Sequence, residues 1–514
     1  MAGGSGSSVR RESTERTPVT GIPWPAPYGG VNGSNPWMTA SQAVPDGCVD
    51  AGNCPLFAIG GTCWYFAQGL ADLGVSTPIG IADTAIGGQR IEEFMINSTM
   101  GTCSQVGTGV WNAQLTGQQV VPFIDMTLKG WVWYQGENNM FNIKGNSDAN
   151  VGYSCLMREL IKGWRAAWSA TPGTTDPLAP FGVVALPTGG SEGGPNMGAM
   201  RIAQTAGHGV LPNVDLPNTF ITQAYDLEDQ WGSGDGPCFA KPPGYGPKVA
   251  WACCPGKGYN ATSCAGREAQ CAPACEAEAG TTPVMGGIHP RSKKPVGERL
   301  ARGAFNTVYG GTASITGPTL SSCGVVGSSL TIEFDKTLLR GDSLILQPAF
   351  PSVQTRYVTY GGTLLWALTN ATTYCLEAHC VMNETSGRCA TGPNGKGQLG
   401  DMCPTWAGGD GATVLPTGGY NTGWVELTNF TLSPSGTGVV VDLTPLNGTA
   451  PAGIRYAWDS LFCCDLTDPT LYVSHDCIAE CPIMSSARLP ANPFHAKILE
   501  GTCSCQAPQV CTGQ

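Results

Sequence analysis

Side chains able to do chemistry are concentrated in the stretch from Leu128 to Asn139. Its first half is an apolar, β-rich run short enough for a buried strand, and it gives way to four residues of interest, Gln135, Gly136, Glu137 and Asn139. An amide, a glycine and a carboxylate at the end of a strand supply a hydrogen-bond donor, close backbone approach and a charge. The stretch therefore predicts one wall of a ligand crevice, and a strand followed by a polar turn is the alternative.

Two other segments carry comparable residues. An expected strand from Thr77 to Ala82 runs into Gly87 and Gly88, which let the backbone approach a ligand and present N–H groups, although a plain turn also fits. Of the five histidines, His289 is the best placed, because Pro290 keeps it out of the α conformation and starts a helix after it. An ordinary loop histidine is the alternative.

Alternating strands and helices must position these residues. Apolar spacing predicts helices near residues 62–73, over 152–169 and 196–206, and after Pro290, while short apolar runs predict strands at 181–186 and 219–224. The second of these strands ends at Asp226. The alternation predicts an α/β fold with a doubly wound, mainly parallel sheet, which puts Gly88, Gln135 and Asp226 on one rim.

The rest of the chain divides by composition. Residues 1–55 are expected to form a tail and loops, 56–310 the α/β domain, 311–499 a β-rich domain, and 500–514 a tail fixed by cysteines. Within the α/β domain, residues 231–286 have six cysteines and no periodicity, which predicts a disulfide-held insertion. Segments such as 329–334, 343–347, 438–443 and 494–498 predict strands of the β-rich domain.

Cysteines and charge limit the compartment and the partners. The 23 cysteines are interpreted mostly as disulfides, with zinc at Cys264, Cys271 and Cys275 as the minor alternative. Seven glycosylation sequons favour an extracellular, lysosomal or other luminal protein. A net charge of −11 argues against nucleic acid or an anionic membrane surface as the main partner, and no apolar run suits a membrane span.

The amino terminus disagrees with a secreted protein, because residues 1–21 are polar and basic and contain no apolar leader. We expect that the true start lies upstream, which the odd number of cysteines also favours, although a free thiol explains that number as well. Extension of the reading frame upstream without finding an apolar leader would contradict this expectation.

Several of these segments together resemble the sialate O-acetylesterase family, a group of SGNH-type hydrolases. The matching pieces are Trp111–Ala113, Met126–Asn139, Phe181–Gly182, Pro217–Phe220, Ile288–Arg291 and Ile454–Trp458. The resemblance implies removal of O-acetyl groups from sialic acids by a serine nucleophile and a histidine base, because a serine hydroxyl attacks poorly until a base takes its proton.

The resemblance also suggests roles for individual residues. His289 matches the family's catalytic histidine, and Gly87 or Gly88 would lend a backbone N–H to the oxyanion, with Gly136 beside them in the substrate-binding group. The side-chain amide of Gln135 or Asn139 would lend another donor. Glu137 matches the family's acidic residue, and we interpret it as orienting its neighbours.

Two departures from the family pattern matter. The family's nucleophile lies in a Gly-Gln-Ser-Asn motif upstream of the region corresponding to Trp24, and this chain has no such motif; Ser34 is the nearest mimic. Many relatives also have an aspartate shortly before the histidine, which is absent here. Asp226, Asp229 or a backbone carbonyl is expected to orient His289 instead.

The sequence thus predicts a secretory-pathway carbohydrate O-acetylesterase whose nucleophile is missing from these 514 residues, so that this form is nearly inactive unless Ser34 attacks. It acts on an O-acetylated sugar and needs no cofactor. A glycan-binding pseudoenzyme without the chemistry is the alternative, and a purely structural cysteine-rich protein would leave the rim motifs unexplained. The sequence leaves the oligomeric state open.

Overall fold

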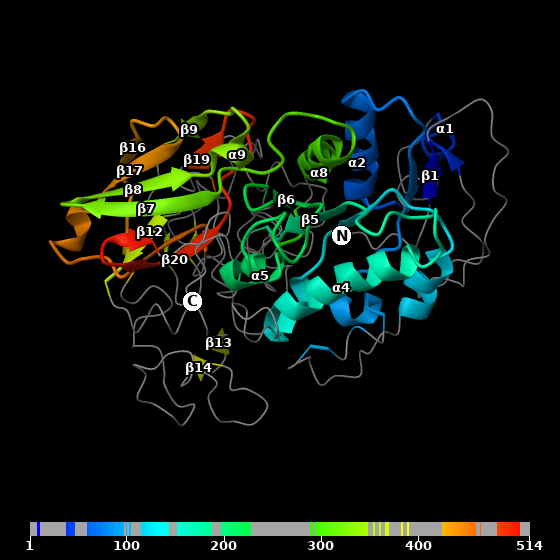
Figure 1. Cartoon of the computed structure of the whole chain (residues 1–514), viewed down its shortest axis with the longest axis horizontal. Coiled ribbons are helices and arrows are strands. Elements are labelled where there is room, and N and C mark those ends of the chain that lie inside the picture. The colour runs from blue at the N-terminus through cyan, green and yellow to red at the C-terminus, as the bar shows by residue number, and fades with distance from the viewer. Residues whose placement is uncertain are drawn as a thin grey trace, which may run out of the picture.

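The structure is a computed structural model, shown in Figure 1, with an α/β part and a β-rich part. It describes residues 8–10, 38–46, 59–96, 99, 102–103, 115–142, 152–187, 197–227, 288–290, 293–347, 353–354, 359–360, 365–369, 382–383, 388–389, 424–458, 463 and 481–503. The expected insertion at 231–286, with its zinc alternative, lies outside these residues, as do Ser34 and Asp229.

A three-stranded parallel sheet forms the centre of the α/β part. Its strands are β4 (Trp131–Trp133), β5 (Phe181–Ala185) and β6 (Thr219–Gln223), in that order, and Trp131, Phe181 and Thr219 are aligned across it. Every residue of β5 and β6 is buried, as expected for parallel strands covered on both faces. All three strands lie within runs that the sequence predicted.

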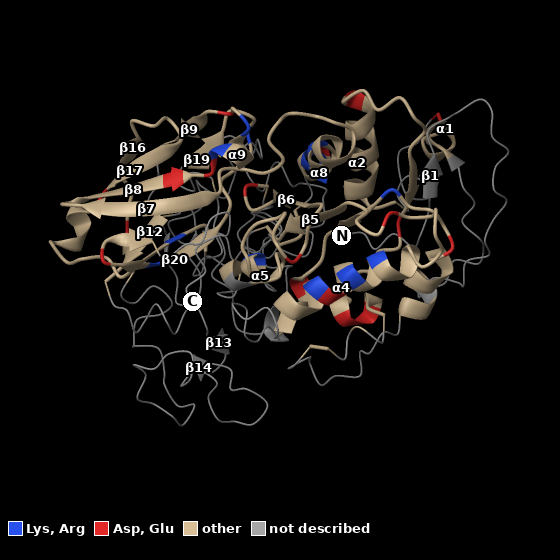
Figure 2. Cartoon of the chain, in the orientation of Figure 1, with Lys and Arg blue, Asp and Glu red and all other residues tan. Residues whose placement is uncertain are grey.

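Helices cover both faces of this sheet, which confirms the doubly wound α/β prediction (Figure 1). Helix α4 (Gly152–Trp168) packs with one face of β5, including Phe181 and Val183, while α2 (Gly61–Asp72) and α8 (Lys293–Val308) pack with the other. Figure 2 shows charged residues at several positions along α4. The apolar positions predicted from its spacing are buried, apart from Ala167, which is partly buried.

Tryptophans build the core between α4 and the sheet. The rings of Trp131 and Trp168 meet edge to face with centroids 5.5 Å apart, and those of Trp133 and Trp164 meet the same way at 5.7 Å. Edge-to-face pairs of this kind are favourable beyond the area they bury. These side chains fix β4, and with it the polar residues that follow Tyr134.

The strand before Gly87 and Gly88 belongs to another sheet, which corrects the expectation of a single shared rim. Strand β3 (Gly80–Ala82) pairs antiparallel with β1 (Ser8–Arg10), and β1 pairs parallel with β2 (Met38–Thr39). Strand pairing depends on contacts far apart in the sequence, which an apolar run does not encode.

The other helices of the α/β part are short. They are α1 (Ala40–Ala43), η2 (Ile91–Phe94), η3 (Thr116–Val120), η4 (Val121–Phe123), η5 (Glu137–Asn142) and α5 (Met197–Ala203). Among the residues that the structure describes, no helix is long and apolar enough to span a membrane.

The C-terminal part of the chain confirms the expected β-rich domain. A nine-stranded sheet has the order β15-β12-β18-β20-β21-β7-β8-β17-β16, with antiparallel pairing between neighbours. In chain order these strands are β7 (Leu320–Val326), β8 (Ser329–Phe334), β12 (Leu365–Leu368), β15 (Trp424–Glu426), β16 (Phe430–Leu432), β17 (Gly438–Asp442), β18 (Gly453–Tyr456), β20 (Phe494–Leu499) and β21 (Thr502–Cys503).

Shorter elements surround this sheet. They are α9 (Lys336–Leu339), η8 (Thr444–Leu446) and three strand pairs: β9 (Leu344–Leu346) with β19 (Ile483–Ser485), β10 (Val353–Gln354) with β11 (Thr359–Tyr360), and β13 (Met382–Asn383) with β14 (Arg388–Cys389).

Disulfides occur in both parts, which confirms that the described cysteines are mostly paired, although Cys63 on α2 is a free thiol. The bonds are Cys103–Cys155, Cys323–Cys503 and Cys463–Cys481. The first joins α4 to the segment between η2 and η3, and the second joins β7 to β21. The third closes the loop between β18 and β19.

Glycines set the spacing between the sheet and α8. The ring of Phe220 on β6 occupies the space where a Cβ at Gly182 on β5 or at Gly303 on α8 would lie. Gly303→Ala should therefore lower the free energy of unfolding by about 1–3 kcal/mol through overpacking, although alanine normally favours a helix interior. Denaturant unfolding of the variant measures the change.

The same substitution in a Phe220→Leu background serves as the control for this clash. The smaller side chain should relieve much of the penalty, so the two changes should not be additive. Equal penalties in both backgrounds would contradict the packing account.

Candidate active site

The polar residues after β4 form a buried cluster at the carboxyl end of the parallel sheet. Gln135, Glu137 and Asn139 each expose less than a tenth of their surface. Gly136 has a φ of +148°, and a Cβ there would lie 2.9 Å from Leu186 on the neighbouring rim segment. Only glycine allows this turn, which directs the chain from the strand into η5.

Gln135 is the centre of this cluster because it links four segments. Its side-chain amide donates to Gln89 O at 3.1 Å and to Asn139 Oδ1 at 2.8 Å, and its Oε1 accepts from the Tyr153 hydroxyl at 2.8 Å. The side chain of Gln204 donates to its backbone carbonyl at 2.9 Å. Both amide protons of Gln135 thus have acceptors within the protein, so this group holds the rim together.

Asn139 connects the cluster to the segment that follows Gly87 and Gly88. Its Oδ1 accepts from the Ile91 backbone N–H at 3.0 Å, and its Nδ2 donates to Glu92 Oε2 at 2.9 Å. The turn at Gly87 and Gly88, called the glycine turn below, therefore lies close to the end of β4. The strands before these two segments, β3 and β4, belong to different sheets. Gly88 has a φ of +78° and is exposed, which keeps its backbone within reach of a ligand.

His289 lies beside Glu137 in this buried setting. Its Nδ1 is 3.9 Å from Glu137 Oε1, and the two side chains are 5% and 3% exposed. Glu137 is therefore the carboxylate that the described structure brings to His289.

Asp226 faces a different partner from the one expected. Arg299 donates to its Oδ1 at 2.7 Å and to its Oδ2 at 2.5 Å, so this carboxylate forms a two-pronged ion pair with α8. No local pattern predicts this ion pair, because Arg299 lies 73 residues further along the chain.

Asp83 is a buried carboxylate that the sequence reasoning overlooked. It follows β3 and accepts from the backbone N–H groups of Gly60 at 2.5 Å and Ala85 at 3.0 Å. Burial raises the pKa of this carboxyl, and the bonds from Ala85 and Gly60 act in the opposite direction. Asp83 thus fixes the start of the loop that leads to Gly87 and Gly88.

Three other supporting residues were also missed. Tyr153 and Gln204 lie on or beside helices that were interpreted as core packing, and nothing in their spacing marked them as polar contacts to Gln135. Glu92 offered a usable signal, because it follows the glycine pair in a polar run, Gln89 to Glu93.

Among the described residues, no group of histidines, cysteines and acids is arranged to bind a metal ion.

Part of the chain is similar to known acetylesterases. Residues 32–233 match the family described as carbohydrate esterase, sialic acid-specific acetylesterase. Sialate O-acetylesterases of Homo sapiens and Pongo abelii are each 34% identical over 186 residues, which is 33% of this chain and 33% of theirs. The enzyme of Mus musculus is 32% identical over 213 residues. These matches confirm the family resemblance, and the chain spans about a third of the length of these relatives.

A solved structure supports the fold. The crystal structure of a carbohydrate acetylesterase from Xanthomonas citri resembles this chain with a TM-score of 0.50 and 17% identity, over 96% of this chain and 73% of that one. The likeness covers both the parallel sheet with its helices and the β-rich part.

The raised pKa of Asp83 predicts a pH-dependent stability. The folded protein holds this proton more tightly than the unfolded chain, in which an aspartate titrates near pH ~3.9. Between that value and the folded pKa, the contribution of Asp83 to the free energy of unfolding falls as the pH rises. The side chain in Asp83→Asn cannot ionise, so the free energy of unfolding of this variant should not show this decrease with rising pH.

Urea unfolding of both proteins from about pH 4 to about pH 7 measures the difference. The exposed carboxylate of Asp72 provides the matched control, and Asp72→Asn should keep the wild-type pH dependence. If Asp83→Asn follows the wild-type pH dependence too, burial of Asp83 does not control its titration.

Proposed function

We propose that this protein is a carboxylic-ester hydrolase that removes O-acetyl groups from sialic acids or related sugars. The observation that carries the proposal is the buried pair of Glu137 and His289, which lies beside the segment after Gly87 and Gly88. The match to the acetylesterase family adds support from an independent direction.

In the proposed reaction, His289 takes the proton of an attacking hydroxyl as that oxygen bonds to the acetyl carbon. Glu137 stabilises the resulting imidazolium through its charge. The backbone N–H of Gly88 or Gly87 holds the oxyanion, and Asn139 keeps this turn against the end of β4. The sugar oxygen then leaves with the proton from His289, and water releases acetate by the same steps.

Gln135 has a supporting role in this proposal, because its amide bonds to Gln89 and Asn139 keep the glycine turn near the histidine. Gly136 provides the turn that brings Glu137 into position. The nucleophile is assigned to a serine outside the described residues, and Ser34 is the candidate within this chain. Asp229 remains a candidate partner of the imidazole.

The substrate and the compartment are proposed on related grounds. An O-acetylated sugar fits the names of the relatives, and the three disulfides favour the secretory pathway. Glycan binding without hydrolysis is the second candidate function, because the family's nucleophile motif is absent from the 514 residues.

Release of acetate from an O-acetylated sialic acid tests the enzyme directly. Any turnover by the chain should fall at least ~100-fold in His289→Ala, because a general base is lost. Loss of turnover in Ser34→Ala would identify Ser34 as the nucleophile. Turnover retained in Ser34→Ala would place the nucleophile elsewhere. Arg302→Lys provides the control, because Arg302 lies on α8 and hydrogen bonds to Ser314 rather than to a residue of the rim.

The product of an upstream-extended reading frame should be measured beside the 514-residue chain. Turnover that appears only in the longer form supports a nucleophile supplied from upstream. Binding of the sugar without acetate release in either form would overturn the hydrolase proposal and favour glycan binding.

A further inference from the structure

The position of His289 depends on helix α8, because the helix begins four residues after it at Lys293. Helix α8 packs on β6 through Gly303 and on α2 through Gly69, where a Cβ would lie 2.8 Å from Ala301. These contacts are apolar and set the distance between layers. They do not by themselves fix how the helix is placed along its axis.

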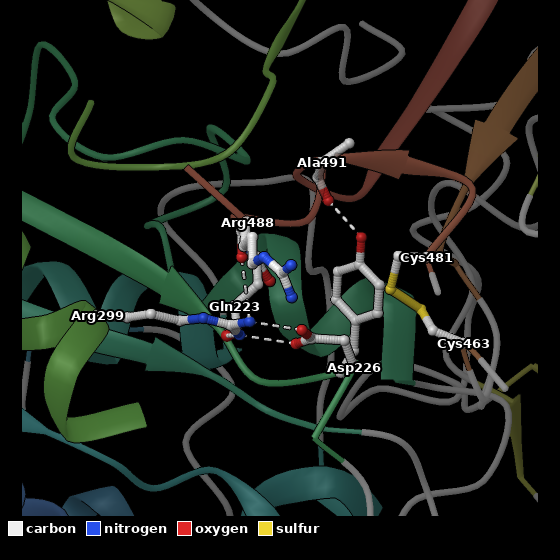
Figure 3. The surroundings of a disulfide bond; sticks show 8 residues. Gln223, Asp226, Arg299, Cys463, Cys481, Arg488 and Ala491 are labelled. Carbon is white, nitrogen blue, oxygen red and sulfur yellow. Dashed lines mark hydrogen bonds and ion pairs between the residues drawn. A yellow bond between two sulfur atoms is a disulfide. The ribbon is translucent and has the colours of Figure 1, made fainter. Parts of the chain in front are cut away.

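Arg299 provides directional contacts from the middle of α8. Its guanidinium donates to the Gln223 carbonyl at 2.8 Å and to both oxygens of Asp226, which lie at and just after the carboxyl end of β6. It also donates to the carbonyl of Arg488 in the β-rich part at 3.4 Å. Figure 3 shows Arg299 reaching Gln223, Asp226 and Arg488. One side chain therefore joins the helix, the sheet rim and the C-terminal part.

Other buried hydrogen bonds strengthen this junction. Gln223 donates to Asn492 Oδ1 at 2.7 Å, and the Tyr225 hydroxyl donates to the Ala491 carbonyl at 2.6 Å. Figure 3 also draws the Cys463–Cys481 disulfide, which joins the segment after β18 to the segment before β19. The rim after β6 is thus enclosed between α8 and the C-terminal segment that follows β19.

The geometry of the ion pair is tightly constrained because both charges are out of water. Asp226 is completely buried and the Arg299 side chain is 8% exposed. A buried ion pair recovers its cost of desolvation only when its geometry is good and its remaining donors are satisfied. The planar guanidinium donates hydrogen bonds to both oxygens of the carboxylate, so the pair resists both rotation and translation of α8 relative to β6.

We propose that Asp226 and Arg299 are positioning residues for His289. The pair fixes α8 against β6 and the β-rich part, and thereby holds the loop that carries His289 opposite Glu137. The β-rich part is then a required portion of the site, because it supplies the Arg488 carbonyl that completes the contacts of Arg299. This inference deepens the proposed esterase function and rests on it for the role of His289.

Two substitutions test the pair while keeping the fold. Arg299→Lys retains the charge but loses the two-pronged contact. The double variant Asp226→Asn/Arg299→Gln replaces the ion pair with amides that hydrogen bond to each other and leaves no buried charge alone, so it provides a second, folded test if the single variant is unstable. Arg302→Lys is the matched control, since Arg302 lies on the same helix and binds Ser314.

The first measurement is the NMR spectrum of protein carrying labelled histidine, with the His289 signal assigned by its loss in His289→Gln. We expect the His289 ring resonances to move in Arg299→Lys and in the double variant, and to stay in place in Arg302→Lys. Thermal unfolding of each variant establishes that it is folded.

The second measurement is the kinetics of acetate release. We expect kcat to fall ~10-fold or more with little change in KM, because a misplaced base lowers the rate without removing sugar contacts. A folded variant whose His289 resonances and kcat match those of the wild type would overturn the proposal. Displaced His289 resonances, with no acetate release from either the 514-residue chain or the upstream-extended form, would support the positioning role and refute the proposed function instead.

Discussion

The hydrogen bonds of Gln135 are the interaction on which the arrangement of the site depends. This one side chain bonds to the segment after the glycine turn, to η5 and to α4, while its backbone carbonyl is bonded by Gln204. A buried amide left without these partners would be costly, so the segments and the amide hold one another in place. The site residues come from separate sheets and loops, and this hydrogen-bond network holds those segments in their relative positions.

Much of the fold follows from patterns that are local in the sequence. The apolar spacing of Leu156 to Trp168 predicts α4, and the short apolar runs at β5, β6, β8 and β20 predict strands. These predictions succeed because the spacing of apolar residues along a helix or a strand is set by a few neighbouring residues. The polar residues that follow β4 are also recognisable in the sequence. The same patterns do not report which strands pair, so the antiparallel partnership of β3 with β1 could not be predicted.

The partners of buried charges were the least predictable feature. Asp226 was one of three candidates to orient His289, beside Asp229 and a backbone carbonyl. In the structure Arg299 bonds to both oxygens of Asp226, and Glu137 is the carboxylate near the imidazole. Such choices depend on contacts between residues far apart in the chain. They also extend beyond the α/β part, since the buried guanidinium of Arg201 joins the carbonyls of Leu186 and Ala457. The β-rich part therefore contributes to the stability of the sheet rim.

The proposed function requires that the rim formed by the glycine turn, η5 and His289 binds the acetyl group of an acetylated sugar. A crystal structure of the protein with a bound O-acetylated sialic acid would show whether it does. We expect the acetyl carbonyl oxygen to lie about 2.7–3.1 Å from a backbone N–H of the glycine turn, with the His289 ring beside the ester. A sugar ordered elsewhere on the protein, with this rim empty at saturating ligand, would contradict the account.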